Sequence, residues 1–432
     1  MHSFHYQTGH LSCEEVPLSD LAQTYGTPLY VYSQNTVLDH FNRLSAALAP
    51  LDHEVCYAIK ANSNLALLRV LGEAGAGFDI VSGGELYRVI QSGGDPTRCT
   101  FAGVGKTEDE IAYALYNDIY CFNIESEPEL LAINRVAASL DKRAPIAVRL
   151  NPDVDAKTHH YISTGKKQNK FGIGLDQAED VFALAAKLDN IFIRGAQIHI
   201  GSQITTSEPF ADAIRKLVPL LKRLKEHYGL EFFSVGGGLG IVYRNSFASG
   251  AAEWWEQTEI PTMTIAEYAH AVVPLLQPLG LRILVEPGRL LVGNAGILLT
   301  RVLYLKQAGE KTFVIIDAGM NDLIRPALYE GYHEIWPELE SRNQKMIQAD
   351  VVGPICESGD FLALDRSLAV VEPGDLLAVM SAGAYGFSMA SNYNSRPLPA
   401  EVLVNGKQHS CVRRRQTYAD LVELELPQET RG

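Results

Sequence analysis

Five chemically distinctive sites lie at the ends of apolar runs that have the length of β-strands. Lys60 follows VCYAI, Asp79 lies in FDIV, His199 comes near the end of FIRGAQIHI, glycines 236–238 follow EFFSV, and Glu286 comes near the end of RILVEP. Any one of them alone could be an ordinary ion pair or a hydrogen-bonded core histidine. In a barrel of parallel strands, however, polar residues at the carboxyl ends of the strands face one active site. Their joint occurrence therefore predicts that they share a site.

The same residues suit the chemistry of pyridoxal 5′-phosphate. A lysine in surroundings of low dielectric constant can have a lowered pKa and, as a neutral amine, form a Schiff base with an aldehyde. The turn GGGLG (236–240) lets backbone N–H groups approach a phosphate, and EPGR (286–289) adds a second turn and a cation. Glu286 can keep the ring nitrogen protonated. GGGLG alone is weak evidence because it lacks the spacing of a dinucleotide or Walker loop. The prediction of pyridoxal phosphate therefore depends on finding Lys60 together with this turn.

The elements that must position these residues repeat along the chain. Eight apolar runs of strand length alternate with segments whose apolar residues are spaced three and four apart. Alternating β and α segments imply right-handed parallel units, and eight of them favour a closed (β/α)₈ TIM-like barrel. A doubly wound open sheet is the alternative. The runs are 55–59, 78–81, 99–103, 119–124, 145–150, 192–200, 231–237 and 282–287.

A second domain follows the barrel pattern. After about residue 295 the chain changes to short strand-like runs separated by Gly, Pro, Asp and Asn, which is typical of an all-β domain. The segment TPLYVYS (27–33) has the same texture and no helix is predicted before it, so we expect it to join that domain. The predicted domains are therefore a barrel of residues 36–294 and a β domain of residues 1–35 and 295–432.

Two long polar segments interrupt the barrel pattern. Segment 151–173, NPDVDAKTHHYISTGKKQNKFGI, follows the fifth predicted strand and is rich in His and Lys. Its position predicts a lid over the barrel mouth that excludes water once substrate binds, with a solvated loop as the alternative. Segment 245–262 is predicted to be a loop insertion in the barrel.

Composition restricts the class of protein. A chain of 432 residues with 47% hydrophobic residues predicts a globular protein with two domains. The formal net charge of −14 argues against nucleic acid or an anionic membrane as a partner. No run reaches the roughly 18 to 20 apolar residues of a membrane span and no signal-peptide pattern is present, so we expect a cytoplasmic protein. The six cysteines form no CxxC or paired framework, which favours reduced thiols, and no metal site is predicted.

Ten short blocks along the chain resemble, in order, those of the diaminopimelate decarboxylases. That family belongs to the alanine-racemase-like, or fold-type III, pyridoxal phosphate enzymes. YAIKAN alone would indicate only this superfamily, whereas HIGSQ together with CESGD is much more specific. The blocks are YAIKANSN (57–64), FDIVSGGE (78–85), THHYIST (158–164), NKFGI (169–173), HIGSQI (199–204), GGGLG (236–240), EPGR (286–289), MNDLIRPALYE (320–330), CESGDF (356–361) and AYGFSMASNYN (384–394).

The resemblance implies a reaction and a set of site residues. The reaction is the decarboxylation of meso-2,6-diaminopimelate to L-lysine and CO₂, the last step of lysine biosynthesis, by a homodimer with shared active sites. Lys60 would hold the cofactor, His199 would stack on its ring, and Cys356 would return a proton to the carbanionic carbon. The implied cofactor-binding residues are Lys60, Asp79, His199, Ser202, Gly237, Gly238, Glu286, Pro287, Gly288, Arg289 and Tyr385. The implied substrate-binding residues are Arg289, Arg325 and Tyr329 at the distal carboxylate, Glu357 at the distal ammonium, and Tyr385.

Three of these residues can also be interpreted without the family resemblance. The planar fork of an arginine suits a carboxylate, although Arg325 could equally form a surface ion pair. Cys356 could be a small buried hydrophobe, but the residues that follow it are Glu, Ser, Gly and Asp, which argue against an apolar packing site. Tyr385 could be a core aromatic, and only the resemblance assigns it to the site.

Competing functions can be weighed from the same residues. Decarboxylases of this fold that act on ornithine, arginine or carboxynorspermidine bind a basic tail, so we expect them to lack CESGD and the Arg289 and Arg325 pair. A racemase needs a second proton-transferring group, and no strand-end tyrosine is evident for that role. A relative that only binds a partner is free to lose Lys60 or Cys356, and both are present.

Overall fold

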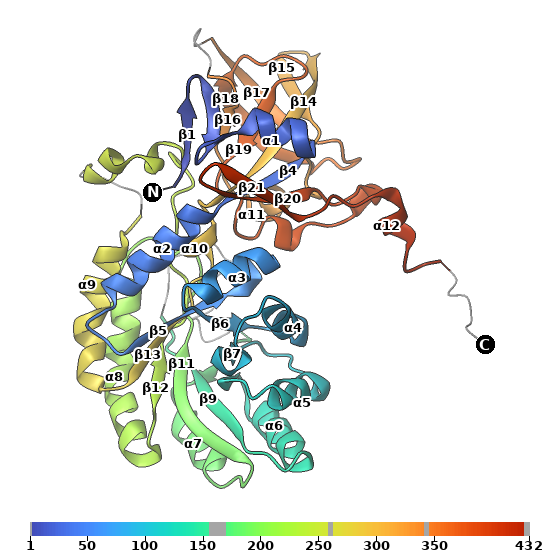
Figure 1. Cartoon of the computed structure of the whole chain (residues 1–432). Helices are drawn as coiled ribbons and strands as arrows, with labels where there is room; N and C mark the ends of the chain where they lie inside the picture. Colours follow the sequence, from blue (N-terminus) through green and yellow to red (C-terminus); the bar gives the residue numbers. More distant parts are fainter. Residues whose placement is uncertain (1, 155–169, 258–261, 341–344, 427–432) are drawn as a thin grey trace. The chain divides into compact units, whose positions relative to one another are not determined.

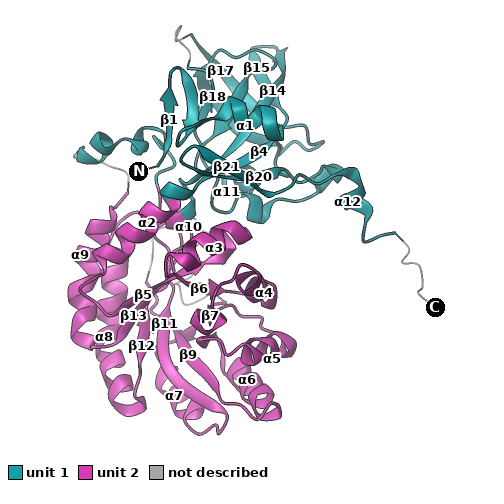
Figure 2. Ribbon diagram, in the orientation of Figure 1, with its two compact units in different colours: residues 1–36, 242–257, 292–432 teal, residues 37–241, 258–291 magenta. Residues whose placement is uncertain are grey.

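The structure is a computed structural model that describes residues 2–154, 170–257, 262–340 and 345–426 of the chain. It divides into two compact units, which are coloured separately in Figure 2. Unit 1 comprises Met1–Thr36, Val242–Gln257 and Val292–Gly432, and unit 2 comprises Val37–Ile241 and Thr258–Leu291.

Unit 2 is a closed barrel of eight parallel strands, which confirms the predicted fold class. Neighbouring strands pair in the order β9-β11-β12-β13-β5-β6-β7-β8, and β8 pairs back with β9 to close the ring. A short strand, β10 (Ile173–Gly174), pairs with the last two residues of β9, Leu150 and Asn151. The barrel strands are β5 (His53–Ala58), β6 (Gly77–Ile80), β7 (Cys99–Phe101), β8 (Cys121–Ile124), β9 (Ala144–Asn151), β11 (Ile191–Ile198), β12 (Phe232–Ser234) and β13 (Arg282–Val285).

Helices surround the barrel strands, as Figure 1 shows. Several begin where a hydroxyl side chain caps the first turn: Ser82 accepts from the N–H of Glu85, and Thr107 forms a capping box with Glu110. The sequence therefore fixes these helix starts locally, and the apolar faces that follow pack on the strands. The helices are α2 (Gln34–Ala47), α3 (Leu65–Glu73), α4 (Gly83–Gln91), α5 (Glu108–Tyr116), α6 (Glu127–Ser139), α7 (Ala178–Ala185), α8 (Glu208–Tyr228) and α9 (Ile265–Leu276).

The interior of the barrel has an apolar part, where five buried residues from different strands form one cluster: Cys56, Cys121, Ala147, Phe232 and Leu284. Gly195 makes room for one of them, because a Cβ there would lie 2.7 Å from the Phe232 ring. This part of the barrel is therefore a packed core.

Unit 1 is built on a β-sheet in the order β18-β17-β15-β14-β4-β20-β21, with β16 and β19 branching from β14. Strand β4 (Leu29–Ser33) lies between β14 and β20, so segment 27–33 does join the β domain, as predicted. The prediction that no helix precedes it is wrong, because α1 (Leu18–Tyr25) does. The other strands are β14 (Gly296–Ala308), β15 (Lys311–Ile316), β16 (Ile335–Pro337), β17 (Met346–Val352), β18 (Phe361–Ala369), β19 (Leu376–Val379), β20 (Ala400–Asn405) and β21 (Gln408–Arg413).

Segment 242–257 belongs to unit 1, although residues 245–262 were predicted as an insertion in the barrel. The carboxylate of Glu334 accepts hydrogen bonds from the backbone N–H groups of Asn245 (3.1 Å) and Phe247 (2.8 Å). The Phe247 ring also packs on Trp336, with 4.5 Å between ring centroids. The segment therefore leaves the barrel after β12 and is held by β-domain side chains. Residues 258–261 of the predicted insertion lie outside the described residues.

Candidate active site

Lys60 and Asp79 meet at the carboxyl end of two neighbouring barrel strands. Lys60 lies in a 3₁₀ turn, Ile59–Ala61, directly after β5, and its Nζ lies 3.1 Å from Oδ2 of Asp79 in β6. The Asp79 side chain is 1% exposed, whereas the Lys60 side chain is 37% exposed. A strand-end lysine thus has both a buried counter-ion and an amine that solvent can reach, which a reacting lysine needs.

Glu286 is a buried carboxylate held by two hydrogen-bond donors. Ser234 Oγ donates to Oε1 (2.6 Å) and Gln197 Nε2 donates to Oε2 (2.9 Å). Burial and the negative charge of Asp79 raise the pKa of Glu286 above its usual range. The carboxyl group is therefore fixed in orientation and suited to share a proton with a ring nitrogen.

Gln197 and Ser234 were not predicted as site residues. They are paired in register on β11 and β12, two and one strands from β13, which Glu286 follows, and both are buried. A polar side chain at an inward position of a barrel strand was the signal that could have identified them, but the inward face is known only once the barrel is closed.

His199 follows β11 and is held as a neutral imidazole. The N–H of Gly237 donates to its Nδ1 (3.2 Å), which assigns the ring proton to Nε2. Burial lowers the pKa of His199 well below its usual range, and the positive charges of Arg149 and Lys60 lower it further. A neutral ring can pack against an aromatic ligand without placing another charge there.

The glycine turn that follows β12 allows the closest approach of backbone in the barrel. A Cβ on Gly237 would overlap the carbonyl oxygen of Glu286, and a Cβ on Gly238 would overlap that of Gly201. Gly236 and Gly238 also have φ values of 70° and 102°, which favour glycine. Only glycine fits here, and the N–H groups of such glycine turns commonly bind phosphates.

The turn after β13 packs directly on the Lys60 segment. Ala58 N–H donates to the carbonyl of Pro287 (3.0 Å), and a Cβ on Gly288 would lie 3.1 Å from the carbonyl oxygen of Ala58. Arg289, which is buried, donates from Nη2 to Ser202 Oγ (3.0 Å). Unit 2 thus brings the predicted barrel residues to one end, and their donor set fits pyridoxal phosphate: an amine, a glycine turn with an arginine, and a carboxyl.

A buried ion pair at the same end was also not predicted. Arg149 Nη1 lies 2.7 Å from Glu125 Oε1, and both side chains are almost fully buried. The N–H groups of Gly103 and Gly172 also donate to the Glu125 carboxylate. This fully hydrogen-bonded pair fixes a positive charge near His199.

Apart from Arg289, which lies in unit 2, the predicted substrate residues lie in unit 1, and Arg325 is the most buried of those in unit 1. Its Nη1 donates to His333 Nε2 (2.7 Å), while His333 Nδ1 lies 2.8 Å from the carbonyl of Met380. The guanidinium carbon also lies 4.6 Å from the centre of the Tyr243 ring. Arg325 starts α11 (Arg325–Tyr329) and the predicted partner Tyr329 ends it. A neutral histidine and an aromatic ring therefore position this guanidinium.

Cys356 and Glu357 are exposed on the turn between β17 and β18. Cys356 N–H donates to Asn394 Oδ1 (2.8 Å). The buried Asp360 fixes the turn, because its carboxylate accepts from the N–H groups of Met320 and Ile355, each at 2.6 Å. The sequence CESGD thus combines an anchoring acid with a thiol and a carboxylate that face outward.

Tyr385 is half-buried and lies in unit 1 with a φ of 57°. A bulky residue in this left-handed region is strained, and such strain is often found at ligand sites. It lies three residues after the buried Ala382, in the glycine-rich run SAGAYGF.

One further prediction can be placed only in part. Residues 155–169 of the predicted lid lie outside the described residues.

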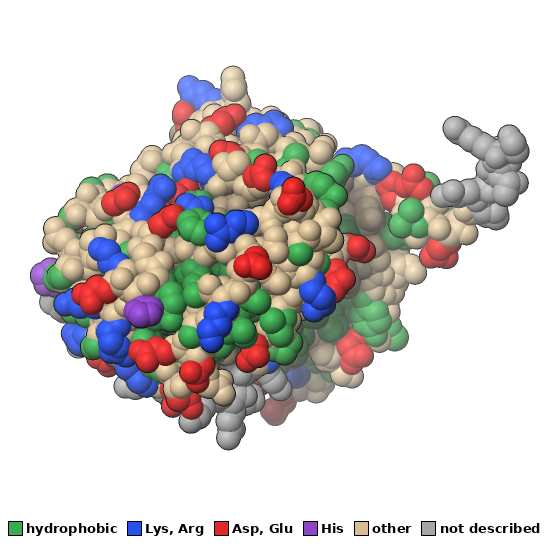
Figure 3. Space-filling model, turned by 90° about the horizontal axis from the view of Figure 1, so that it is seen from below, with side chains coloured by type: hydrophobic (Ala, Val, Ile, Leu, Met, Phe, Trp, Pro, Cys, Tyr) green, Lys and Arg blue, Asp and Glu red, His purple; other side chains and the backbone are tan. Residues whose placement is uncertain are grey.

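Within the described part of the chain, no group of three or more His, Cys, Asp or Glu could hold a metal ion, and no helix is long and apolar enough to cross a membrane. On the face shown in Figure 3, positive and negative side chains are interspersed around a hydrophobic area.

Comparisons with known proteins agree over nearly the whole chain. The family model described as pyridoxal-dependent decarboxylase, pyridoxal binding domain, matches residues 34–293. A diaminopimelate decarboxylase from Vibrio cholerae serotype O1 is 50% identical over 98% of this chain and 99% of its own. One from Aquifex aeolicus is 47% identical over 98% of this chain and 97% of its own. The crystal structure of diaminopimelate decarboxylase from Helicobacter pylori complexed with L-lysine is 41% identical, with a TM-score of 0.88 over 94% of this chain and 99% of that chain.

Proposed function

Because this chain belongs to the pyridoxal-dependent decarboxylases, and among them to the diaminopimelate decarboxylases, we propose that it removes one carboxylate of meso-2,6-diaminopimelate as CO₂ to give L-lysine, the last step of lysine biosynthesis. The observation that carries the proposal is the accessible amine of Lys60 at 3.1 Å from buried Asp79, in one barrel with the fixed carboxyl of Glu286. Relatives named for this reaction are up to 50% identical over nearly the full length.

The barrel residues would bind pyridoxal phosphate. That cofactor withdraws electrons from the substrate's α-carbon, so that the carboxylate can leave as CO₂. Lys60 would hold the cofactor's aldehyde group through its Nζ, and Asp79 orients that amine. Glu286 keeps the ring nitrogen protonated, and the neutral His199 packs on the ring. The phosphate is held by Gly237, Gly238, Ser202 and the turn of Pro287, Gly288 and Arg289.

The β-domain residues would select the substrate and complete the reaction. Arg325 and Tyr329, with Arg289 from the barrel, bind the distal carboxylate, and Glu357 binds the distal ammonium group. A fork of two arginines favours a substrate with a second carboxylate over one with a bare amine tail. Tyr385 contacts cofactor and substrate. The Cys356 thiol gives its proton to the α-carbon that has lost CO₂, and the product leaves as lysine.

The proposal includes a homodimer with shared sites in the cytoplasm. Cys356 and Glu357 are exposed in the single chain, on a turn fixed by Asp360. A reactive thiol and a substrate-binding carboxylate gain by being desolvated, and a second subunit that covers the turn provides this.

A substrate panel tests the function directly. Release of CO₂ is measured from meso-diaminopimelate, L-ornithine, L-arginine and carboxynorspermidine, with the Lys60→Ala variant as the control for background. We expect release from diaminopimelate alone. Release from ornithine or arginine with none from diaminopimelate would overturn the proposed substrate.

A further inference from the structure

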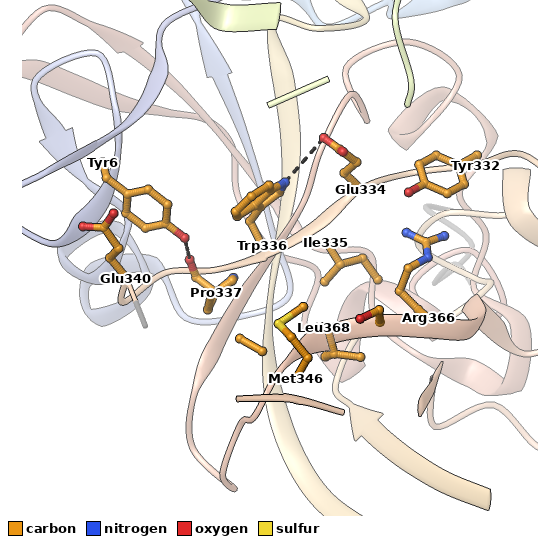
Figure 4. Close-up of a pocket in the computed structure, with 12 residues that line it drawn as sticks. Tyr6, Tyr332, Glu334, Ile335, Trp336, Pro337, Glu340, Met346, Arg366 and Leu368 are labelled. Carbon is orange, nitrogen blue, oxygen red and sulfur yellow. Dashed lines mark hydrogen bonds between the residues drawn. The ribbon is translucent and has the colours of Figure 1, made fainter. Parts of the chain in front are cut away.

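Unit 1 contains a cleft that lies between β16 and the β17–β18 hairpin and has a volume of about 320 Å³ (Figure 4). This volume is at the lower end of the range for small-molecule sites. No residue proposed above for cofactor or substrate lines it. The lining residues are Tyr6, Tyr332, Glu334, Ile335, Trp336, Pro337, Glu340, Met346, Arg366, Ser367, Leu368 and Ala369.

The middle of the cleft is apolar and offers a flat aromatic wall. The Trp336 ring is held by Phe247 at 4.5 Å and by Tyr6 at 6.5 Å between ring centroids. Leu368 is buried, whereas Met346 is 57% exposed and leaves apolar surface open to solvent. A planar apolar group could therefore lie on Trp336 against flexible Met346 with little rearrangement.

One end of the cleft carries two arginines, and no ion pair with a carboxylate is formed by either among the described residues. Arg366 Nη1 donates to the carbonyl of His333 (2.6 Å), and its guanidinium carbon lies 4.0 Å from the centre of the Tyr332 ring. The guanidinium of Arg244 lies 4.1 Å from the same ring centre. Among the residues that the structure describes, neither arginine has a carboxylate oxygen within 4.0 Å. Burial lowers the pKa of Arg366 and the charge of Arg244 lowers it further, whereas Tyr332 and the charge of Glu334 act in the opposite direction.

The acidic residues of the cleft cannot supply the missing anion in their present arrangement. Glu334 already accepts from three groups of residues 245–247 and, at 3.4 Å, from Trp336 Nε1. Glu340 lies beside Tyr6, at the opposite end of the cleft from Arg366 (Figure 4). The cleft is thus cationic at the Arg366 end, apolar in the middle and acidic at the far end.

We propose that this cleft binds a small organic anion with a flat apolar body, with the anionic group at Arg366 and the body on Trp336. A carboxylate, sulfonate or phosphate would satisfy the same guanidinium. The charge of Glu340 directs the anionic group to the Arg366 end. The proposal does not depend on which amino acid the enzyme decarboxylates.

Naphthalene-2-sulfonate is a suitable probe, with naphthalene-2-sulfonamide as its uncharged analogue of the same shape. Binding to the holoenzyme is measured by isothermal titration calorimetry. We expect one saturable site per chain, with the sulfonamide bound about tenfold more weakly or worse, since a charge-assisted hydrogen bond is lost. Equal affinity for the two compounds, or no saturable binding of the sulfonate, would overturn the proposal.

Three variants locate the probe. Arg366→Met should weaken sulfonate binding about tenfold or more. Met346→Glu places a like charge on an exposed position of the cleft, so the fold should tolerate it while sulfonate binding is lost. Arg215→Met is the control, because Arg215 is a 60% exposed arginine of α8 in the barrel. If Met346→Glu binds the sulfonate as the wild type does, the probe lies elsewhere and the assignment is wrong.

Discussion

The barrel end and the β-domain turn present reactive groups in opposite ways. In the barrel, Asp79 and Glu286 are buried, and Glu286 has a hydrogen-bond donor on each carboxylate oxygen. In the β domain, Cys356 and Glu357 are exposed, and only the backbone of their turn is fixed. One chain therefore preorganises the cofactor side of the proposed site but leaves the proposed proton donor exposed.

Arg325 stands between these two cases. It is 7% exposed, and its side-chain partners include His333 and the Tyr243 ring. Both groups hold the guanidinium in place. The β domain thus offers a positioned cation and an open thiol, which fits a role in choosing the substrate.

Loss of Lys60 should have the largest effect. In Lys60→Ala no amine remains to hold the cofactor, so CO₂ release should fall to background. Borohydride reduction of the wild type followed by peptide mass mapping should place a pyridoxyl group on Lys60. Lys222→Ala, an exposed lysine of α8, is the control and should behave as the wild type. A pyridoxyl group on another lysine contradicts the assignment.

Arg325→Gln should separate the two regions. Removal of a charge-assisted bond to a desolvated carboxylate costs about 2 to 4 kcal/mol, or roughly 30-fold to 1000-fold in kcat/KM for diaminopimelate. The affinity for pyridoxal phosphate, titrated by absorbance, should not change because the barrel side is intact. Arg223→Gln, at a 61% exposed arginine, serves as the matched control. An unchanged kcat/KM would remove Arg325 from the substrate site.

Gln197→Leu tests whether the barrel side depends on the residues that hold Glu286. The Leu variant removes the donor to Oε2, so cofactor affinity should fall about tenfold. Ser234→Ala removes the donor to Oε1 and should act in the same direction. Cofactor titration of the apoproteins measures both. If the two variants bind the cofactor as the wild type does, the orientation of Glu286 does not depend on these donors.

Asp322, a buried acid of the β domain, should make the free energy of unfolding depend on pH without affecting activity. Burial chiefly raises the pKa of Asp322 from 3.8 to about 7. The folded chain therefore holds this proton more tightly than the unfolded chain, so the wild type loses free energy of unfolding as the pH rises from about 4 to about 7. The loss is at most about 1.4 kcal/mol per pH unit.

Asp322→Asn should lack this dependence. As the pH rises, the free energy of unfolding of Asp322→Asn should increase relative to that of the wild type. The difference should level off above pH 7. The three tryptophans, Trp254, Trp255 and Trp336, all lie in unit 1, so urea unfolding followed by their fluorescence reports on that unit. Parallel curves for the two proteins between pH 5 and 8 would contradict the raised pKa.

Much of the barrel could be predicted because its information is local. Each apolar run has the length of a strand, and Lys60, His199 and Glu286 stand where the run stops. Gln197 and Ser234 could not be predicted in this way, because they lie inside strands and only closure of the ring shows that they point to Glu286.

The β domain was predicted less completely because its contacts are between distant residues. Segment 242–257 is held by Glu334, which lies 87 residues after Phe247 in the chain. The hydrogen bond between Arg325 and His333 forms only because the loop after α11 brings His333 back to Arg325. The family resemblance supplied Arg325, Cys356 and Tyr385, but not the His333, Asn394 and Asp360 side chains that position their surroundings.

The central claim is that the barrel side and the Cys356 turn of one active site come from two subunits. Lys60→Ala and Cys356→Ala chains with different affinity tags are produced together, and dimers that carry both tags are purified. Each variant alone should be nearly inactive. Each mixed dimer would hold one doubly defective and one intact site, so we expect about half the wild-type CO₂ release from diaminopimelate. Mixed dimers that form, as shown by mass, yet remain as inactive as the single variants would show that Cys356 serves the lysine of its own chain, which contradicts the shared site.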